Sequence, residues 1–237
     1  MRFAILLLMA AMAMTPATSL AQTSDSLVKG GDSYRDQYNN KDALDLYRKA
    51  VAADPQNLQA QTRLAQCLVD NGEDLNSNES EKYYQEAMEL AGRITAKNPD
   101  LAEGHYQLAL ATGKMALFKG GKEKVKLSRE VERSGVKALE LDPNNSRGRI
   151  LMGVYYREIA NLNWALKMFA NTFFGGLPKG TNEDAVRELK KALELNSRSI
   201  RARYELGKTY EEMGMKSEAG DEYKMATELP MADHLDP

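Results

Sequence analysis

The chain has little of several residue types that active sites commonly use. Its 237 residues include one cysteine and two histidines, and its formal net charge is −2. The lone cysteine, Cys67, cannot form an intrachain disulfide, and two histidines cannot build a multi-histidine metal site. A slightly acidic balance also argues against the basic surface that neutralises nucleic-acid phosphates. We therefore expect no metal, no other cofactor and no nucleic-acid partner.

Recognisable catalytic motifs are missing as well. Cys67 has no histidine in the sequence context of a nucleophile and its base. Residues 119–123, Lys-Gly-Gly-Lys-Glu, follow a helical segment rather than a strand and lack the Ser or Thr that follows the lysine of a phosphate-binding loop. His105 falls on a position that packs one helix on another. The sequence therefore favours a binding protein over an enzyme.

The first 21 residues differ in kind from the rest. Arg2 supplies a positive start, residues 3–14 form an uncharged apolar run, and Ser19-Leu20-Ala21 forms a small-x-small cleavage signal. This pattern predicts a signal peptide over residues 1–21 and a periplasmic or secreted protein. The alternative is an uncleaved membrane anchor, but the apolar run is shorter than the ~20 residues that a membrane-spanning helix requires.

Residues 22–230 are organised by a repeated order of large, small and aromatic positions. The first unit places Leu27, Gly30, Gly31 and Tyr34 on one helical face, Ala43, Tyr47 and Ala50 on a second, and Pro55 at its end. Small residues let two antiparallel helices approach closely, and aromatic residues fill the space between them. This order resembles the tetratricopeptide repeat, a helix pair that buries its apolar face by stacking on further copies.

Four further units follow, and their internal spacing changes along the chain. The step from the first helix to the second is 9 residues in the first and fifth units, 19 in the second and third, and 29 in the fourth. We expect an all-α, right-handed α-solenoid of about five helix pairs, with insertions in the middle three. We place the first two insertions in a loop at residues 71–80 and in a segment at residues 118–126. Thr23 and Ser24 are expected to cap the first helix, and residues 231–237 to form a short tail.

The insertion of the fourth unit, residues 162–178, is rich in apolar side chains. It contains Leu162, Trp164, Leu166, Met168, Phe169, Phe173 and Phe174, including the only tryptophan of the chain. Four of these residues recur at the spacing of one helical face, and the others fall outside it, so the predicted helix is apolar on more than one side. Two interpretations stay open: a plug packed into the superhelix, or a surface that contacts a ligand, a partner or a membrane.

The first helices of tetratricopeptide repeats line a concave surface, and this chain places both cations and apolar side chains there. The candidate binding residues are Tyr106, Arg147, Ile150, Val154, Arg157, Arg201, Tyr204 and Lys208. Arginine forks suit carboxylate or phosphate groups, and the apolar neighbours suit an acyl chain or hydrophobic peptide side chains. Alternatively, the cations pair with carboxylates such as Glu158 and Glu211 and bind nothing.

The carboxy-terminal half also resembles a known family. The residues that carry the resemblance are Met152, Gly153, Tyr156, Trp164, Lys167, Phe173, Phe174, Pro178, Ala185 and the run from Leu206 to Tyr210. They resemble the regulator of microtubule dynamics family, over residues 146–230 most closely and as a repeat pattern back to Leu27. The resemblance implies tetratricopeptide-like helices and an ability to hold apolar or lipid-like ligands. Eukaryotic members of that family are linked to microtubules and organelle membranes. An exported protein does not meet microtubules, so we do not carry the family's name over as a function.

These observations favour an exported, non-enzymatic scaffold that captures a protein or peptide segment along its concave face. In this hypothesis Arg147, Arg157, Arg201 and Lys208 orient an anionic group of the segment. One alternative is a carrier of lipid or another small apolar ligand, close to a membrane, with a pocket lined by Trp164, Phe169, Phe173 and Phe174. Another alternative is a periplasmic accessory component of a tripartite transporter. The sequence leaves the oligomeric state open.

Overall fold

The computed structural model describes residues 16–75, 78–177 and 179–230, and these residues fold into eleven α-helices. Ten of the helices form five antiparallel pairs. The pairs are α1 (Pro16–Asp36) with α2 (Asn40–Ala53), α3 (Leu58–Leu75) with α4 (Ser80–Lys97), α5 (Ala102–Lys119) with α6 (Gly121–Leu141), α7 (Ser146–Ala160) with α9 (Asn182–Leu195), and α10 (Ile200–Glu212) with α11 (Lys216–Thr227). Most of the expected signal peptide and the tail at residues 231–237 lie outside the described residues.

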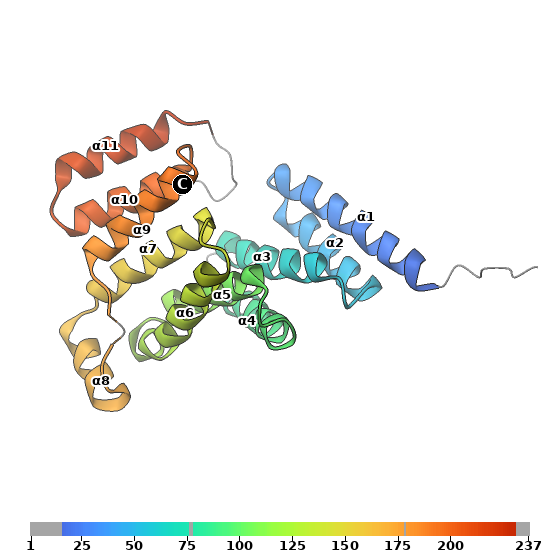
Figure 1. The fold of residues 1–237 in the computed structure, drawn as a ribbon, viewed down its shortest axis with the longest axis horizontal. Coiled ribbons are helices and arrows are strands. Elements are labelled where there is room, and N and C mark those ends of the chain that lie inside the picture. The colour runs from blue at the N-terminus through green and yellow to red at the C-terminus, as the bar shows by residue number, and fades with distance from the viewer. Residues whose placement is uncertain (1–15, 76–77, 178, 231–237) are drawn as a thin grey trace, which may run out of the picture.

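The pairs stack in chain order, and each pair contacts the next. In Figure 1 they follow one another in an arc from α1 at one end to α11 at the other. The expected α-solenoid of five helix pairs is confirmed. Its core is divided into one cluster among α1 to α5, a second where α6, α7 and α8 (Trp164–Phe174) meet, and a third among α9 to α11. Among the described helices, none combines the length and the apolar content needed to cross a bilayer.

The predicted loop at residues 71–80 is wrong for residues 71–75 and 80, which belong to α3 and α4; residues 78–79 form a turn, and 76–77 lie outside the described residues. In the segment predicted at residues 118–126, every residue except Gly120 is helical. Helix α3 continues to Leu75, and its residues Asn71 and Gly72 are buried. Helices α5 and α6 are separated by Gly120 alone. Ten residues shared between two helices add about one and a half turns to each. The expected loop at 71–80 was inferred from polar and glycine-rich composition, whereas Gly72 is glycine because it packs on the ring of Tyr84.

The start of the first helix also differs from the prediction. Helix α1 already runs at Pro16, so Thr23 and Ser24 lie inside it rather than at its cap. The buried hydroxyl of Ser24 instead donates a hydrogen bond to the carbonyl oxygen of Ala50 in α2, at 2.9 Å. A residue type that often caps helices here ties the two helices of the first pair together.

The helices of a pair touch where a small residue of the first meets a large side chain of the second. A Cβ atom added to Gly31 would lie 2.5 Å from the ring of Tyr47, and one added to Gly207 would lie 2.5 Å from the ring of Tyr223. Each ring is held by its hydroxyl group, which donates to Asp32 in the first pair at 2.6 Å and to Glu211 in the last at 2.7 Å. Glycine is therefore needed at these two positions for the close approach.

The single cysteine lies in this core. Cys67 is fully buried, as its position on the packing face of a helix predicts. Burial is the main cause that raises the pKa of its thiol to about 12, with the charge of Asp70 adding to it. The thiol stays protonated at neutral pH and acts as a small apolar side chain.

Helix α8 accounts for the insertion in the fourth pair. The side chain of Asn163 caps its start by accepting a hydrogen bond from the backbone N–H of Leu166 at 3.0 Å, and Gly175 ends it in the left-handed conformation at φ +69°. Helix α9 then begins with a capping box between Thr181 and Asp184. The predicted helix in this insertion is confirmed, and it lies beside α6 at the outer edge of the arc (Figure 1).

The glycine contact leads to a stability prediction. We expect Gly207→Ala to lower the free energy of unfolding by about 1–3 kcal/mol, because the new methyl group would force the ring of Tyr223 out of place. Gly220→Ala is the matched control: its Cβ atom would meet nothing within 4 Å. That variant should gain about 0.5–1 kcal/mol, because alanine favours the helix. Urea unfolding of both variants tests this, and equal effects would refute the role assigned to Gly207.

Candidate functional site

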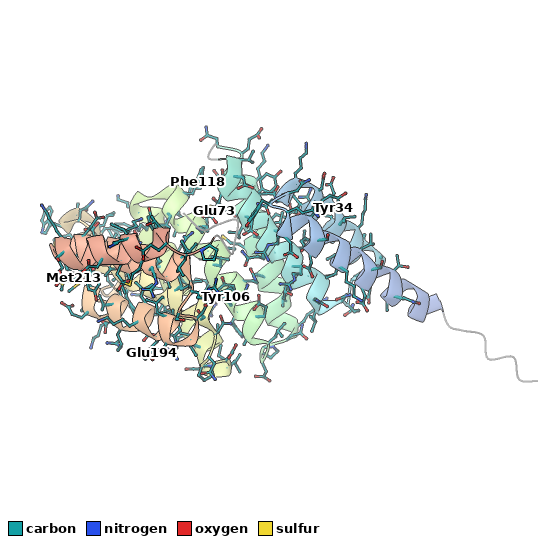
Figure 2. The ribbon with its side chains drawn as sticks, turned by 90° about the horizontal axis from the view of Figure 1, so that it is seen from above. Tyr34, Glu73, Tyr106, Phe118, Glu194 and Met213 are labelled. Carbon is teal, nitrogen blue, oxygen red and sulfur yellow. The ribbon has the colours of Figure 1, made fainter. Side chains whose placement is uncertain are left out.

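A cavity of about 510 Å³ opens on the concave side of the arc. Its walls come from the long helices α5 and α6, from α7 and from the start of α10, with α1 and α3 closing one end. Figure 2 shows Tyr106 near the middle of the molecule, between the carboxy-terminal and amino-terminal helix pairs. The cavity therefore joins three or more repeat units, and the stacking of the pairs sets its shape.

The floor of the cavity is apolar. Helix α5 contributes Tyr106, Leu110 and Leu117, which follow the spacing of one helical face, and α7 contributes Ile150 and Val154. The side chain of Tyr106 is only 6% exposed. Burial, with smaller contributions of opposite sign from Arg147 and Glu103, raises the pKa of its hydroxyl to about 12. Tyr106 is therefore a neutral, largely apolar part of the floor at physiological pH.

The rim of the cavity is strongly cationic. Eight of its lining residues are basic and three are acidic: Arg35, Lys114, Lys124, Arg147, Arg157, Arg198, Arg201 and Lys208 against Glu73, Glu158 and Glu205. The whole chain, in contrast, carries a net charge of −2. Asp70 and Glu103, which lie just outside the lining, pair with two of these cations, so the wall keeps a smaller excess of positive charge than this count. Walls of low dielectric strengthen the field of that excess on an entering ligand.

Part of this charge is used to join the first helices of neighbouring pairs. Arg35 of α1 contacts Asp70 of α3 at 3.2 Å, and Arg147 of α7 contacts Glu103 of α5 at 3.0 Å. Two glutamine side chains of α3 and α5, Gln66 and Gln107, connect these two ion pairs through hydrogen bonds of 2.7 to 3.1 Å. One polar chain thus crosses four first helices and fixes their spacing along the cavity.

A second link joins α7 to α10 and is more deeply buried. A guanidinium nitrogen of Arg157 lies 2.7 Å from the carboxylate of Glu205, and the same arginine donates to the backbone carbonyl oxygen of Glu205 at 3.1 Å. Arg201 contacts this carboxylate from the other side at 3.0 Å. Burial by itself would raise the pKa of Glu205, but the charges of Arg157 and Arg201 outweigh it and hold the pKa below its usual value.

The structure places seven of the twelve predicted binding residues on the cavity wall. These are Tyr106, Arg147, Ile150, Val154, Arg157, Arg201 and Lys208. Tyr204 does not line the cavity, but its ring lies 5.5 Å from the ammonium group of Lys208. The alternative that the cations pair with carboxylates holds for Arg147, which contacts Glu103, and for Arg157 and Arg201, which share Glu205. Of the two carboxylates that were named, Glu158 lies 3.8 Å from Arg157, and Glu211 accepts a hydrogen bond from Tyr223.

The other four predicted residues lie apart from the cavity. Trp164, Phe169, Phe173 and Phe174 all belong to α8, which packs against α6 at the outer edge and contributes no residue to the cavity wall. Only Ala170 of this helix is fully buried. These aromatic side chains therefore do not belong to the concave cavity, and a pocket that they line for a lipid would have to lie elsewhere. Phe169 and Phe174 partly fill the junction of α6, α7 and α8, whereas Trp164 and Phe173 point to solvent.

Several cavity residues were missed because they belong to the lengthened helices. Lys114 and Leu117 lie in the last turns of α5, just before the inserted segment predicted at residues 118–126, and Lys124 lies within that segment, in α6. The sequence held a signal for the two α5 residues, because positions 106, 110, 113 and 117 keep the spacing of one helical face up to the start of the segment. Among the described residues, no three His, Cys, Asp or Glu side chains are grouped so as to hold a metal ion.

Stacked helix pairs around a concave cavity define the class of this protein, an α-solenoid of the tetratricopeptide type. A thermophilic TPR protein of Thermus thermophilus matches it with a TM-score of 0.67 at 20% identity, covering 86% of this chain and 90% of that one. The MamA protein matches with a TM-score of 0.50 at 19% identity, and the match covers 87% of this chain and 91% of MamA. At such identities the likeness shows the fold alone, and this fold suits scaffolds for protein–protein interaction.

Sequence comparison gives the family. The model described as Regulator of microtubule dynamics protein 1-3 matches residues 20–237, so the chain belongs to that family, as its sequence motifs predict. Regulator of microtubule dynamics protein 3 of Mus musculus is 32% identical over 171 residues, which are 71% of this chain and 36% of the relative. Regulator of microtubule dynamics protein 1 of Bos taurus is 28% identical over 154 residues, which are 62% of this chain and 48% of the relative. The chain spans less than half the length of either relative.

The buried ion pair leads to a second stability prediction. Arg157→Ala leaves the carboxylate of Glu205 buried with one of its two cations removed, and we expect it to destabilise the fold by about 3 kcal/mol. Arg48→Ala is the control, because Arg48 pairs with Glu86 on the surface with 45% of its side chain exposed. That change should cost less than about 1 kcal/mol. Thermal and urea unfolding measure both; a loss for Arg157→Ala no larger than the control's would contradict this account.

The lowered pKa of Glu205 leads to a prediction about how stability depends on pH. Because the pKa of Glu205 is lowered in the folded state, its ionised form contributes stability above its unfolded pKa of about 4.3, and this contribution is lost as pH falls through the folded value. We expect Glu205→Gln to be less stable than the wild type at pH 7, with the difference shrinking below about pH 4. Urea unfolding across this range measures it, and a difference that stays constant with pH would contradict the prediction.

Proposed function

We propose that this protein is a non-enzymatic scaffold that captures an extended segment of a partner protein in its concave cavity. The observation that carries the proposal is the combination of an apolar floor with a rim of eight basic and three acidic residues. A peptide with apolar side chains would bury them on the floor, and its carboxylate or phosphate groups would contact the rim. The tetratricopeptide fold of the family supports a role in protein binding.

The cations that would meet the ligand lie at the α10 end of the cavity. Arg147 and Arg157 already have carboxylate partners, so their main role is to join helices. Arg198 and Lys208 also line the cavity, and among the described residues neither has a carboxylate within ion-pair distance. Arg201 shares Glu205 with Arg157. We therefore assign the anionic group of the ligand to Arg198, Lys208 and Arg201.

A second candidate function is a carrier of an anionic amphiphile such as a lipid. The volume of about 510 Å³ falls within the range of small-molecule sites, and the apolar floor would accept an acyl chain below the cationic rim. The ligand would contact the side chains of α5 and α7, because the aromatic residues of α8 lie elsewhere. A protein segment remains our first choice, since the cavity extends along several repeat units.

We also propose that the protein is exported and acts in the periplasm or outside the cell. Support comes from the positive start, the apolar run and the small-x-small site within residues 1–21. The mouse and bovine relatives are named as regulators of microtubule dynamics. Export would separate this chain from microtubules, so we propose that it shares their helical scaffold and binds a different partner.

Peptide binding tests the proposed function. We expect fluorescent peptides that alternate apolar and acidic residues to bind the protein, and matched peptides with lysine in place of the acidic residues not to bind. Arg198→Glu combined with Lys208→Glu should weaken binding at least about tenfold, because two favourable ionic contacts become repulsive. Fluorescence anisotropy gives the dissociation constants.

The control is Lys41→Glu combined with Lys49→Glu, which makes the same charge change on exposed positions of α2. Equal losses in the two double variants, or equal binding of acidic and basic peptides, would overturn the proposal. Native mass spectrometry of the protein purified from the periplasm separates the two candidates. A co-purified lipid that the acidic peptide displaces would favour the carrier function. A mass that corresponds to a chain beginning near Gln22 would support export.

A further inference from the structure

Helix α8 presents large apolar side chains to solvent at the edge of the molecule. The exposed fractions are 76% for Trp164, 68% for Phe173 and 48% for Met168. Its opposite side packs on α6 and α7 through Leu166, Ala170 and Phe174. In Figure 1 α8 projects from the arc away from the other carboxy-terminal helices. These exposed side chains thus lie on a protruding helix rather than in a groove: Trp164 and Met168 share one side of α8, and Phe173 lies on another side.

The segment that carries these side chains has no acidic residue, although Glu123 and Glu130 of the neighbouring α6 pair there with Lys126 and Arg133. The 24 residues from 159 to 182 contain no aspartate or glutamate, although acidic residues make up 34 of the 237 in the chain. The same stretch contains Lys167 and Lys179, both exposed. Two cations of α6 lie against it: Lys122 is 5.0 Å from the centre of the Phe169 ring, and Arg129 is 5.8 Å from that of Phe174.

Hydrogen bonds from α6 and a helix cap hold α8 in this position. The guanidinium group of Arg129 donates hydrogen bonds to the carbonyl oxygens of Phe174 and Gly176 at the end of α8. The cap of Asn163 fixes the other end. The exposed rings are therefore presented by a rigid support and do not need to be ordered when a partner binds.

We propose that α8 docks the protein on the surface of an anionic phospholipid bilayer. Trp164, Met168 and Phe173 would enter the boundary between headgroups and acyl chains, where tryptophan is favoured. Lys122, Lys167, Lys179 and Arg129 would face the lipid phosphates. A protruding apolar helix with cations beside it, on a segment that has no carboxylate of its own, complements a negative lipid surface better than the mixed charges of a protein partner. The proposal is independent of what the concave cavity binds.

The only tryptophan of the chain lies on this surface, so its fluorescence reports the docking directly. The experiment adds vesicles of phosphatidylglycerol and phosphatidylcholine, or of phosphatidylcholine alone, to the intact protein. We expect the anionic vesicles to shift the emission of Trp164 to the blue, to shield it from acrylamide and to expose it to brominated lipids. Neutral vesicles should bind at least about tenfold more weakly, and added salt should weaken the binding to anionic vesicles.

Two double variants separate the apolar contribution to vesicle binding from the ionic contribution. Met168→Ser with Phe173→Ser should weaken vesicle binding at least about tenfold, and both positions are exposed, so the melting temperature should stay close to that of the wild type. Lys167→Glu with Lys179→Glu should also weaken it, whereas Lys41→Glu with Lys49→Glu should not. An emission of Trp164 that does not change with anionic vesicles would overturn the proposal. So would a blue shift that depends on protein concentration without vesicles, which would indicate docking of a second copy.

Discussion

The close contact between a small residue of one helix and a large side chain of the next is the constraint on which this structure depends. At Gly31 and Gly207 the contact leaves no room for a methyl group beside the tyrosine ring. It sets how near the two helices of a pair lie, and therefore how each pair exposes an apolar face for the next to cover. The arc of pairs and its concave cavity follow from repeating this contact.

The concave side carries a second kind of constraint, which acts between pairs. Apolar stacking fixes distance but tolerates sliding, whereas the ion pairs of Arg35, Arg147 and Arg157 with carboxylates of neighbouring first helices select one register. A buried pair such as Arg157 with Glu205 gains little net stability over apolar residues, but breaking it is costly. The cations that remain without carboxylate partners among the described residues, Arg198 and Lys208, are then available to a ligand.

The repeats could be predicted because their signal is local. Gly31 and Tyr47 stand within one unit, and Gly207 and Tyr223 return in the fifth unit at the same spacing, with Pro230 one residue short of the position of Pro55. The lengthened helices were mistaken for loops because polar residues such as Asn71 are buried there by partners from other helices, with its amide donating to the carbonyl oxygen of Asn40 at 3.0 Å. The pairing of Arg157 with Glu205 joins residues 48 positions apart, a choice that the spacing within one helix does not reveal. The position of Arg157 and its weaker contact with Glu158 at 3.8 Å follow from local spacing, whereas its buried partner Glu205 was not predicted.

Helix α6 connects the two surfaces to which we assign binding. Its residues Lys124 and Ser128 line the cavity, while Lys122 and Arg129 contact α8. Both sets lie within the first three turns of one helix, so a bilayer bound to α8 would hold the cavity at a fixed orientation beside it. For a protein partner this geometry would confine capture to the vicinity of the membrane. For an amphiphilic ligand it would shorten the path between the lipid surface and the cationic rim. The insertions in the middle of the chain thus place the cavity and α8 on one helix, α6, and this shared support links the two binding proposals.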